Sequence, residues 1–99
     1  MATFITTIKF TDQGIKNVGE TTKRASAVKA SAKKMGVKVT DIYWTLGAFD
    51  GLLVFEAPDD ETATTLLLKV GSQGNVQTTT ARAFSAAEMD KILAKAQGG

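Results

Sequence analysis

The chain contains neither cysteine nor histidine, and these two absences exclude more chemistry than any motif in it suggests. Without cysteine, the 99 residues offer no disulfide, no thiol nucleophile and no thiolate ligand for a metal. Without histidine, the commonest general base and the commonest transition-metal ligand are missing, so a Ser-His-Asp triad is excluded. We therefore predict no metal site and no cofactor, and any catalysis would depend on Asp, Glu, Lys, Tyr or Arg.

Long apolar runs are also absent, and there is a single proline. No stretch approaches the roughly 20 apolar residues of a transmembrane helix, and the opening MATFITTIKF lacks the parts of a signal peptide. Hydrophobic residues at 43% and charged residues at 22% are ordinary for a globular protein. We expect one domain over residues 1–97, a disordered tail at 98–99, a cytoplasmic location and no membrane partner.

Charge is distributed unevenly, although the net value is only +2. Residues 12–35 hold six basic and two acidic side chains, whereas residues 41–61 hold six acidic side chains and no basic one. Opposed segments of this kind can steer a partner or pair across a subunit interface. The simpler interpretation is two solvated faces with no specific role, since isolated surface ion pairs contribute little.

The pattern of apolar residues predicts four strands and three helices. Residues 3–10, 37–46, 51–57 and 76–84 are rich in β-branched and aromatic residues, and the Asp50-Gly51 turn predicts an antiparallel hairpin. A long amphipathic helix is expected from Asp12 to Met35, with Thr11 as N-cap and Gly36 ending it. Further helices are expected over residues 60–70, capped by Asp59, and 85–96, opened by a Ser85-x-x-Glu88 capping box.

The resulting order, β-α-β-β-α-β plus a final helix, predicts an α+β, ferredoxin-like fold. Such a fold has a four-stranded antiparallel sheet with two helices on one face. The other face presents a problem, because residues 52–55, Leu-Leu-Val-Phe, are apolar on both sides of their strand. Ile5, Thr7 and Tyr43 also point to this second face. Either the last helix or a second subunit should cover it, and we favour a second subunit and hence a homo-oligomer.

Several stretches resemble the GYD domain family, small bacterial and archaeal proteins of unsettled function. They include Ile42-Tyr43-Trp44-Thr45-Leu46-Gly47, Phe49-Asp50 and Glu56-Ala57-Pro58-Asp59-Asp60-Glu61. Matches at residues 4–11, 71–76 and 80–84 extend the resemblance over nearly the whole chain. Where the family motif has a tyrosine before the aspartate, this chain has Phe49, so any role of that hydroxyl is absent. Similar folds commonly pair into dimeric α/β barrels, which agrees with the apolar second face.

Two carboxylates are candidate general bases. Buried beside Phe49, Asp50 would have a raised pKa, although an aspartate is also expected simply to make the Asp-Gly turn. Glu56 shares its strand face with Leu52 and Val54, and a carboxylate there needs a partner, for which Arg82 and Lys9 are candidates. The alternative is a strand-end glutamate bent towards water.

Four residues are candidate ligand contacts: Tyr43, Trp44, Phe49 and Arg82. Tyr43 and Trp44 must point to opposite faces of their strand, so one should be in the core and the other on the second face. Packing in a core or an interface is the simpler role for both rings.

RNA binding is not expected, even though RNA-recognition modules share this strand order. Their third strand carries stacking aromatics, whereas Asp50-Gly51-Leu52-Leu53-Val54-Phe55 is acidic at its start and then aliphatic. The leading hypothesis is a self-associating binding or assembly module without catalysis. The alternative is a cofactor-independent enzyme on a dimeric α/β-barrel scaffold, with Glu56 or Asp50 as base and Tyr43 or Arg82 orienting a small organic substrate.

Overall fold

The computed structural model describes residues 1–98 and confirms the predicted order of strands. Its elements are β1 (Ala2–Phe10), α1 (Asp12–Lys16), the 3-10 turn η1 (Val18–Glu20), α2 (Thr21–Lys34), β2 (Lys38–Trp44), β3 (Gly51–Ala57), α3 (Asp60–Ser72), β4 (Val76–Ala83) and α4 (Ala86–Gln97). Within the expected tail at 98–99, Gly99 lies outside the described residues. In the described part of the chain, each helix is too short or too polar to cross a membrane.

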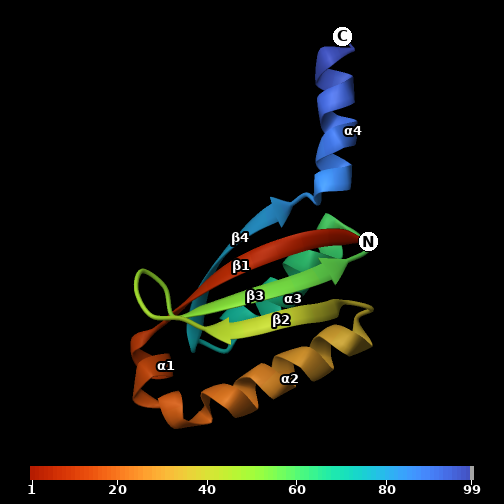
Figure 1. The fold of residues 1–99 in the computed structure, drawn as a ribbon. Helices are drawn as coiled ribbons and strands as arrows, with labels where there is room; N and C mark the ends of the chain where they lie inside the picture. The colour runs from red at the N-terminus through yellow and green to blue at the C-terminus, as the bar shows by residue number, and fades with distance from the viewer. Residues whose placement is uncertain (99) are drawn as a thin grey trace.

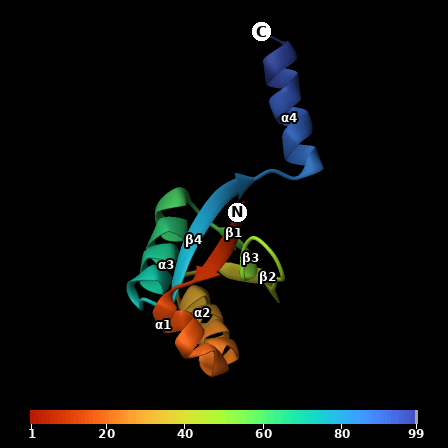
Figure 2. The same cartoon turned by 90° about the vertical axis from the view of Figure 1, so that its left-hand side faces the viewer.

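The four strands form one antiparallel sheet in the order β2-β3-β1-β4, so the two central strands are β1 and β3. The hairpin expected between β2 and β3 is present, and its loop is tied by the Thr45 hydroxyl, which donates to the Phe49 carbonyl at 2.6 Å. Helices α2 and α3 lie on the same side of the sheet (Figures 1 and 2). The fold is therefore α+β and ferredoxin-like, as the element order predicts.

The core lies between this helical layer and one face of the sheet. Its buried apolar residues are Phe4, Ala32, Val37, Leu53, Phe55, Ala57, Ala63 and Leu66. The rings of Phe4 and Phe55 stack with centroids 5.3 Å apart. One polar side chain, Thr6, is buried among them, and its hydroxyl is hydrogen-bonded to that of Thr80 at 2.8 Å. This pairing removes most of the cost of burying a hydroxyl.

The single helix expected over residues 12–35 is wrong, because the chain breaks at Asn17 into α1, η1 and α2. The two helical pieces have different anchors. Thr11 and Gln13 bind α1 to the turn before β4, with the Thr11 hydroxyl donating to the Gly74 carbonyl at 2.6 Å, whereas α2 packs along the sheet. Ile15 and Val18, which would lie on the apolar side of a single amphipathic helix over residues 12–35, are exposed.

Strand β2 contains a bulge that the sequence pattern did not predict. The register passes from Val39, opposite Phe55, to Asp41, opposite Val54, and leaves Thr40 as the extra residue. Because side chains alternate along a strand, this insertion lets Val39 and Ile42 both pack against the core. Beyond the bulge the alternation is regular, so Tyr43 shares a face with Leu52 and Trp44 lies on the opposite face.

Candidate interaction surface and cavity

The sheet face away from α2 and α3, here called the open face, has no helix of residues 1–98 packed over it (Figure 2). The register places Ile5 between Val54 and Ala81, and Leu52 between Thr7 and Tyr43. Ile5 is 38% exposed and Tyr43 56% exposed, whereas Leu53 and Phe55, which point to the other side of β3, are at most 3% exposed. The sheet thus has one buried and one unburied apolar face.

Polar side chains border the open face. Glu56 lies opposite Thr3 on β1 and Lys38 on β2, at the end of the sheet. On β2 the Tyr43 hydroxyl donates to Asp41 Oδ1 at 3.4 Å. An apolar centre with a polar border is the composition of a protein interface.

The partners expected for Glu56 lie elsewhere. Lys9 is on the same face as Glu56 but at the opposite end of β1, since Glu56 is paired with Thr3 and Lys9 with Gln77. Arg82 is on the helical side, because it is paired with Phe4. The structure therefore brings neither base to Glu56.

Arg82 instead joins the end of β4 to α4. Its guanidinium carbon lies 4.5 Å from the ring centroid of Phe84 and 5.8 Å from that of Phe4. Its Nη2 donates to Glu88 Oε2 at 3.2 Å, and its Nη1 donates to the Thr3 and Ala83 carbonyls. These contacts make Arg82 a junction residue between the sheet and the last helix.

Helix α4 begins with the predicted capping box, in which Ser85 and Glu88 exchange hydrogen bonds between side chain and backbone N–H. The Ser85 backbone N–H and the Arg82 guanidinium hold the pKa of Glu88 below its usual range. At the start of α3, hydrogen bonding to the Thr62 hydroxyl and backbone N–H lowers the pKa of Asp59 in the same way. Both shifts come from helix caps, so neither marks a catalytic carboxylate.

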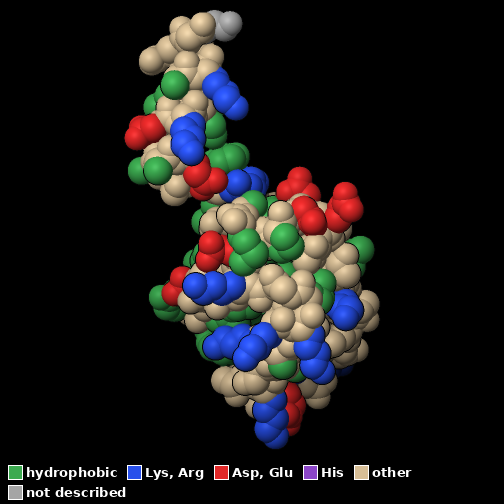
Figure 3. Space-filling view, turned by 90° about the vertical axis from the view of Figure 1, so that its right-hand side faces the viewer, with side chains coloured by type: hydrophobic (Ala, Val, Ile, Leu, Met, Phe, Trp, Pro, Cys, Tyr) green, Lys and Arg blue, Asp and Glu red, His purple; other side chains and the backbone are tan. Residues whose placement is uncertain are grey.

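The last helix stands off the body of the domain (Figure 1), and no residue of Ala86–Gln97 is buried. Met89, Ile92, Leu93 and Ala96 follow the i, i+3, i+4, i+7 spacing of one apolar stripe. Figure 3 shows hydrophobic and charged side chains mixed along this helix, with acidic side chains gathered on the nearby part of the body. The stripe is a second apolar surface without a partner in the described part of the chain.

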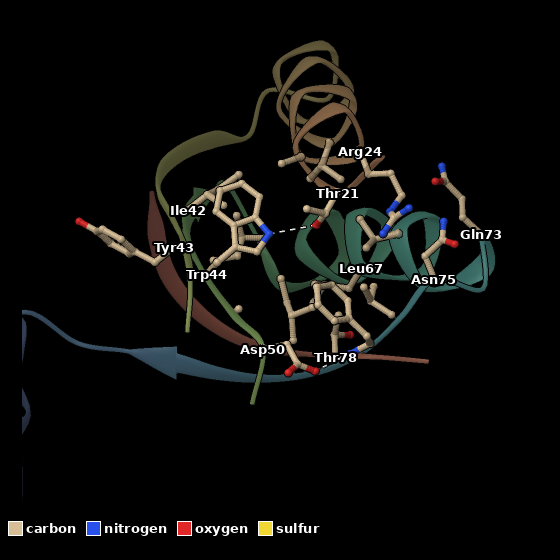
Figure 4. A pocket seen from close by; sticks show the side chains of 18 residues that line it. Thr21, Arg24, Ile42, Tyr43, Trp44, Asp50, Leu67, Gln73, Asn75 and Thr78 are labelled. Atoms are coloured by element: carbon tan, nitrogen blue, oxygen red, sulfur yellow. Dashed lines mark hydrogen bonds between the residues drawn. The ribbon is translucent and has the colours of Figure 1, made fainter. Parts of the chain in front are cut away.

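A cavity of about 80 Å³ opens between α2, α3 and the sheet (Figure 4). This volume is several times the roughly 10–15 Å³ that one water needs. Most of its wall is apolar, and polar groups make up the rest. The aliphatic residues include Ile8, Val28, Ile42, Leu53, Leu67 and Val70.

Several polar groups around the cavity already have partners in the chain. Trp44 Nε1 donates to the Thr21 hydroxyl at 3.0 Å, and Arg24 donates to the Asn17 and Gly14 carbonyls. Asp50 Oδ2 accepts the Phe10 backbone N–H at 2.9 Å, which ties the hairpin loop to the end of β1. The carboxylate of Asp50 thus has a structural partner, as a turn residue would.

The four predicted ligand contacts do not converge. Trp44 borders the cavity, but the Tyr43 side chain points away from it to the other side of the sheet (Figure 4). Phe49 belongs to the hairpin loop and Arg82 to the junction with α4. Among residues 1–98, no group of three or more acidic side chains is placed to hold a metal ion.

Sequence reasoning missed two features of the structure. One is that α4 stands away from the sheet: the spacing of Met89, Ile92 and Leu93 predicts an apolar stripe, but it does not indicate whether the stripe packs on its own sheet. The other is the close approach at Gly14, where a Cβ would lie 1.9 Å from the Asn75 carbonyl oxygen. Residues 14 and 75 approach only in the folded chain.

Comparison with known proteins agrees with this architecture. The family model of the GYD domain matches residues 4–93. This chain belongs to the GYD domain family. A relative from Thermus thermophilus is 32% identical over 90 residues, which is 90% of this chain and 95% of the relative. That protein is named glutamine synthetase and cystathionine beta-lyase binding protein.

Two solved structures share the fold of this GYD protein. The crystal structure of TTHA0845 from Thermus thermophilus is 20% identical, with a TM-score of 0.57 over 87% of this chain and 96% of that one. The crystal structure of MtbAldR gives a TM-score of 0.69 at 15% identity and covers 85% of this chain. The chain spans about half of MtbAldR, 53% of its length. At these identities the likeness concerns the fold alone.

Proposed function

We propose that this GYD protein is a self-associating binding module, whose assembly buries the open face and whose targets are other proteins. One observation carries the proposal: a central strand, β3, has apolar side chains on both sides, yet among them only Leu53, Phe55 and Ala57, all on the helical side, are buried within the described chain. An apolar patch with a polar border is uncommon on a monomer and typical of an interface. The name of the Thermus relative supports protein targets, since that protein is said to bind two enzymes.

The positions of the carboxylates favour binding over catalysis. Glu56 lies at the end of the open face, away from the cavity, and Asp50 is occupied by the Phe10 backbone N–H. A general base needs a water-excluding site in which other polar groups converge on the substrate. The enzymatic alternative would require the second subunit to complete such a site around Glu56.

The test of self-association is the molar mass measured by light scattering from low to high micromolar concentration. We expect an oligomer for the wild-type chain and a monomer for Val54→Lys, because a lysine on the open face would have to be buried beside apolar side chains. Leu68→Lys is the matched control, since Leu68 on α3 is 68% exposed and away from the open face. A monomeric wild type at high micromolar concentration would overturn the proposal.

Protein binding is tested separately, with purified glutamine synthetase and cystathionine beta-lyase from the same organism. We expect at least one to bind the immobilised chain with saturable kinetics in biolayer interferometry. If neither enzyme binds while self-association is observed, the targets of this family member differ from those named for its relative.

A further inference from the structure

The described part of the chain has two apolar surfaces that it does not cover itself, the open face and the stripe on α4. In the stripe, Met89 and Leu93 are each 43% exposed and Ile92 is 37% exposed. An isolated helix of roughly 12–15 residues or fewer is marginal in water, and α4 has only 12. Most helical stability in proteins comes from packing an apolar face, so α4 needs a surface to pack against.

The junction of β4 and α4 directs the helix away from its own open face. Arg82 is held against the rings of Phe4 and Phe84 and donates to Glu88, and the capping box fixes the first turn of α4. The helix therefore leaves the body in a defined direction, and it projects past the end of the sheet in both ribbon views (Figures 1 and 2). While these contacts hold, α4 is presented to another molecule.

We propose that α4 of one copy packs its stripe across the open face of a second copy, and that the second copy returns the same contact. This inference rests on the proposed self-association and names what covers the open face. The sizes agree: the 12 residues of α4 span about 18 Å, and the nine residues of β1 span about 30 Å. Each sheet would then carry helices on both faces.

Exchange of α4 explains both exposed surfaces with one partner. A dimer formed by sheet against sheet would cover Ile5 and Val54 but leave the stripe of α4 in water on both copies. In the exchanged arrangement a twofold axis relates two identical contacts, so both surfaces are buried together. Lys91 and Lys95, on the other side of α4 from the stripe, would remain in solvent.

The absence of cysteine allows a direct test by disulfide crosslinking. Two single-cysteine variants, Val54→Cys on the open face and Ile92→Cys on α4, are mixed under mild oxidation. We expect the mixed disulfide between them to exceed either self-coupled product at least several-fold in mass spectrometry. Leu68→Cys mixed with Ile92→Cys is the matched control, and it should give little product because Leu68 lies on the exposed side of α3.

The other outcomes separate this inference from the proposed function. If Val54→Cys couples mainly to itself and the wild type is an oligomer, the sheets pack against each other and helix exchange is overturned. If the double variant Val54→Cys/Ile92→Cys closes a disulfide within a monomer, α4 folds back on its own sheet and the inference is also overturned. If the wild type is monomeric, the proposed self-association fails as well.

A second measurement uses charge instead of crosslinking. Ile92→Lys/Leu93→Lys should weaken the dimer at least 10-fold by light scattering, because two lysines would face the partner's apolar sheet. Ala87→Lys/Ala94→Lys adds the same two charges away from the stripe and should leave the dimer intact. Equal dimerisation of the two double variants would overturn the helix exchange.

Discussion

The two faces of the sheet differ in what covers them more than in their composition. On the helical face, Phe4, Leu53 and Phe55 pack under α2 and α3 and are nearly or fully buried. On the open face, Ile5, Leu52 and Val54 are also apolar, but residues 1–98 fold no layer over them. An alternating strand usually separates a core face from a water face, whereas β3 is apolar on both. Contacts within the described chain therefore account for only one of the two apolar faces, and contacts of the other face outside the chain are what the proposed self-association would supply.

The largest effect is expected from replacing adjacent residues of β3 that point to opposite faces of the sheet, which tests the difference in burial between the two faces. Phe55→Ala should lower the free energy of unfolding by about 3–5 kcal/mol, because it removes a fully buried ring stacked on Phe4. Val54→Ala should cost less than about 1.5 kcal/mol in the monomer, since its site is only half buried. Urea unfolding at a concentration where light scattering finds monomers measures both. Similar losses would contradict the two-face description.

A second test concerns the anchor of α1 at the end of the helical layer. Gly14→Ala should lower the free energy of unfolding by about 1–3 kcal/mol, because the added Cβ would overlap the Asn75 carbonyl oxygen. Gly71→Ala is the control, since nothing lies within 4 Å of the corresponding Cβ position and the residue is in α3. It should be neutral or stabilise the chain by up to about 1 kcal/mol. Thermal and urea unfolding of the pair compare the two sites, and equal effects would refute the close approach.

The smallest expected effect is the response of α4 to acid. The pKa of Glu88 is lower in the folded chain than in the unfolded one. The stabilisation of the folded chain by ionised Glu88 is therefore fully present above the usual glutamate pKa of about 4.3, and it is lost as the pH falls through the lowered pKa. Between about pH 4.3 and the folded pKa, we expect the junction with Arg82 and Ser85 to loosen while the core stays folded. Amide shifts of Ser85 and Glu88 in an NMR titration measure this change.

The control for the acid titration is Glu88→Gln, which keeps the side chain's length but cannot titrate. In that variant the Ser85 amide should show no transition in this pH range. A transition of the same size in Glu88→Gln would mean that another group causes the change.

Much of the fold was predictable from local patterns. The caps at Thr11, Asp59 and Ser85 lie where they were expected, since a cap depends on residues within one helical turn. Strand β3 has its predicted bounds, and α3 extends only two residues further than expected. The break of the first helix was not predicted, and the contacts that hold α1 apart from α2 join Thr11 and Gln13 to residues 73–75, some 60 positions away, so no local pattern contains them.

The candidate site was predictable only in part. Alternation along β3 correctly placed Glu56 on one face with Leu52 and Val54. It could not tell that Arg82 points to the other face and bonds to Glu88, because the relation between strands depends on the register of the whole sheet. The cavity beside Trp44 likewise depends on how far α2 and α3 stand apart, which neither helix determines by itself.

The amino-acid sequence alone establishes which residues are apolar, where the caps at Thr11, Asp59 and Ser85 lie and that β3 carries apolar side chains on both faces. These properties are local, because they follow from side-chain chemistry and from the periods of strand and helix. Which apolar face is covered, and in which direction α4 leaves the body, follows only from the folded arrangement. Both depend on the sheet register, on the bulge at Thr40 and on the contact of Arg82 with Glu88. Each of these features is a contact between different elements of the fold.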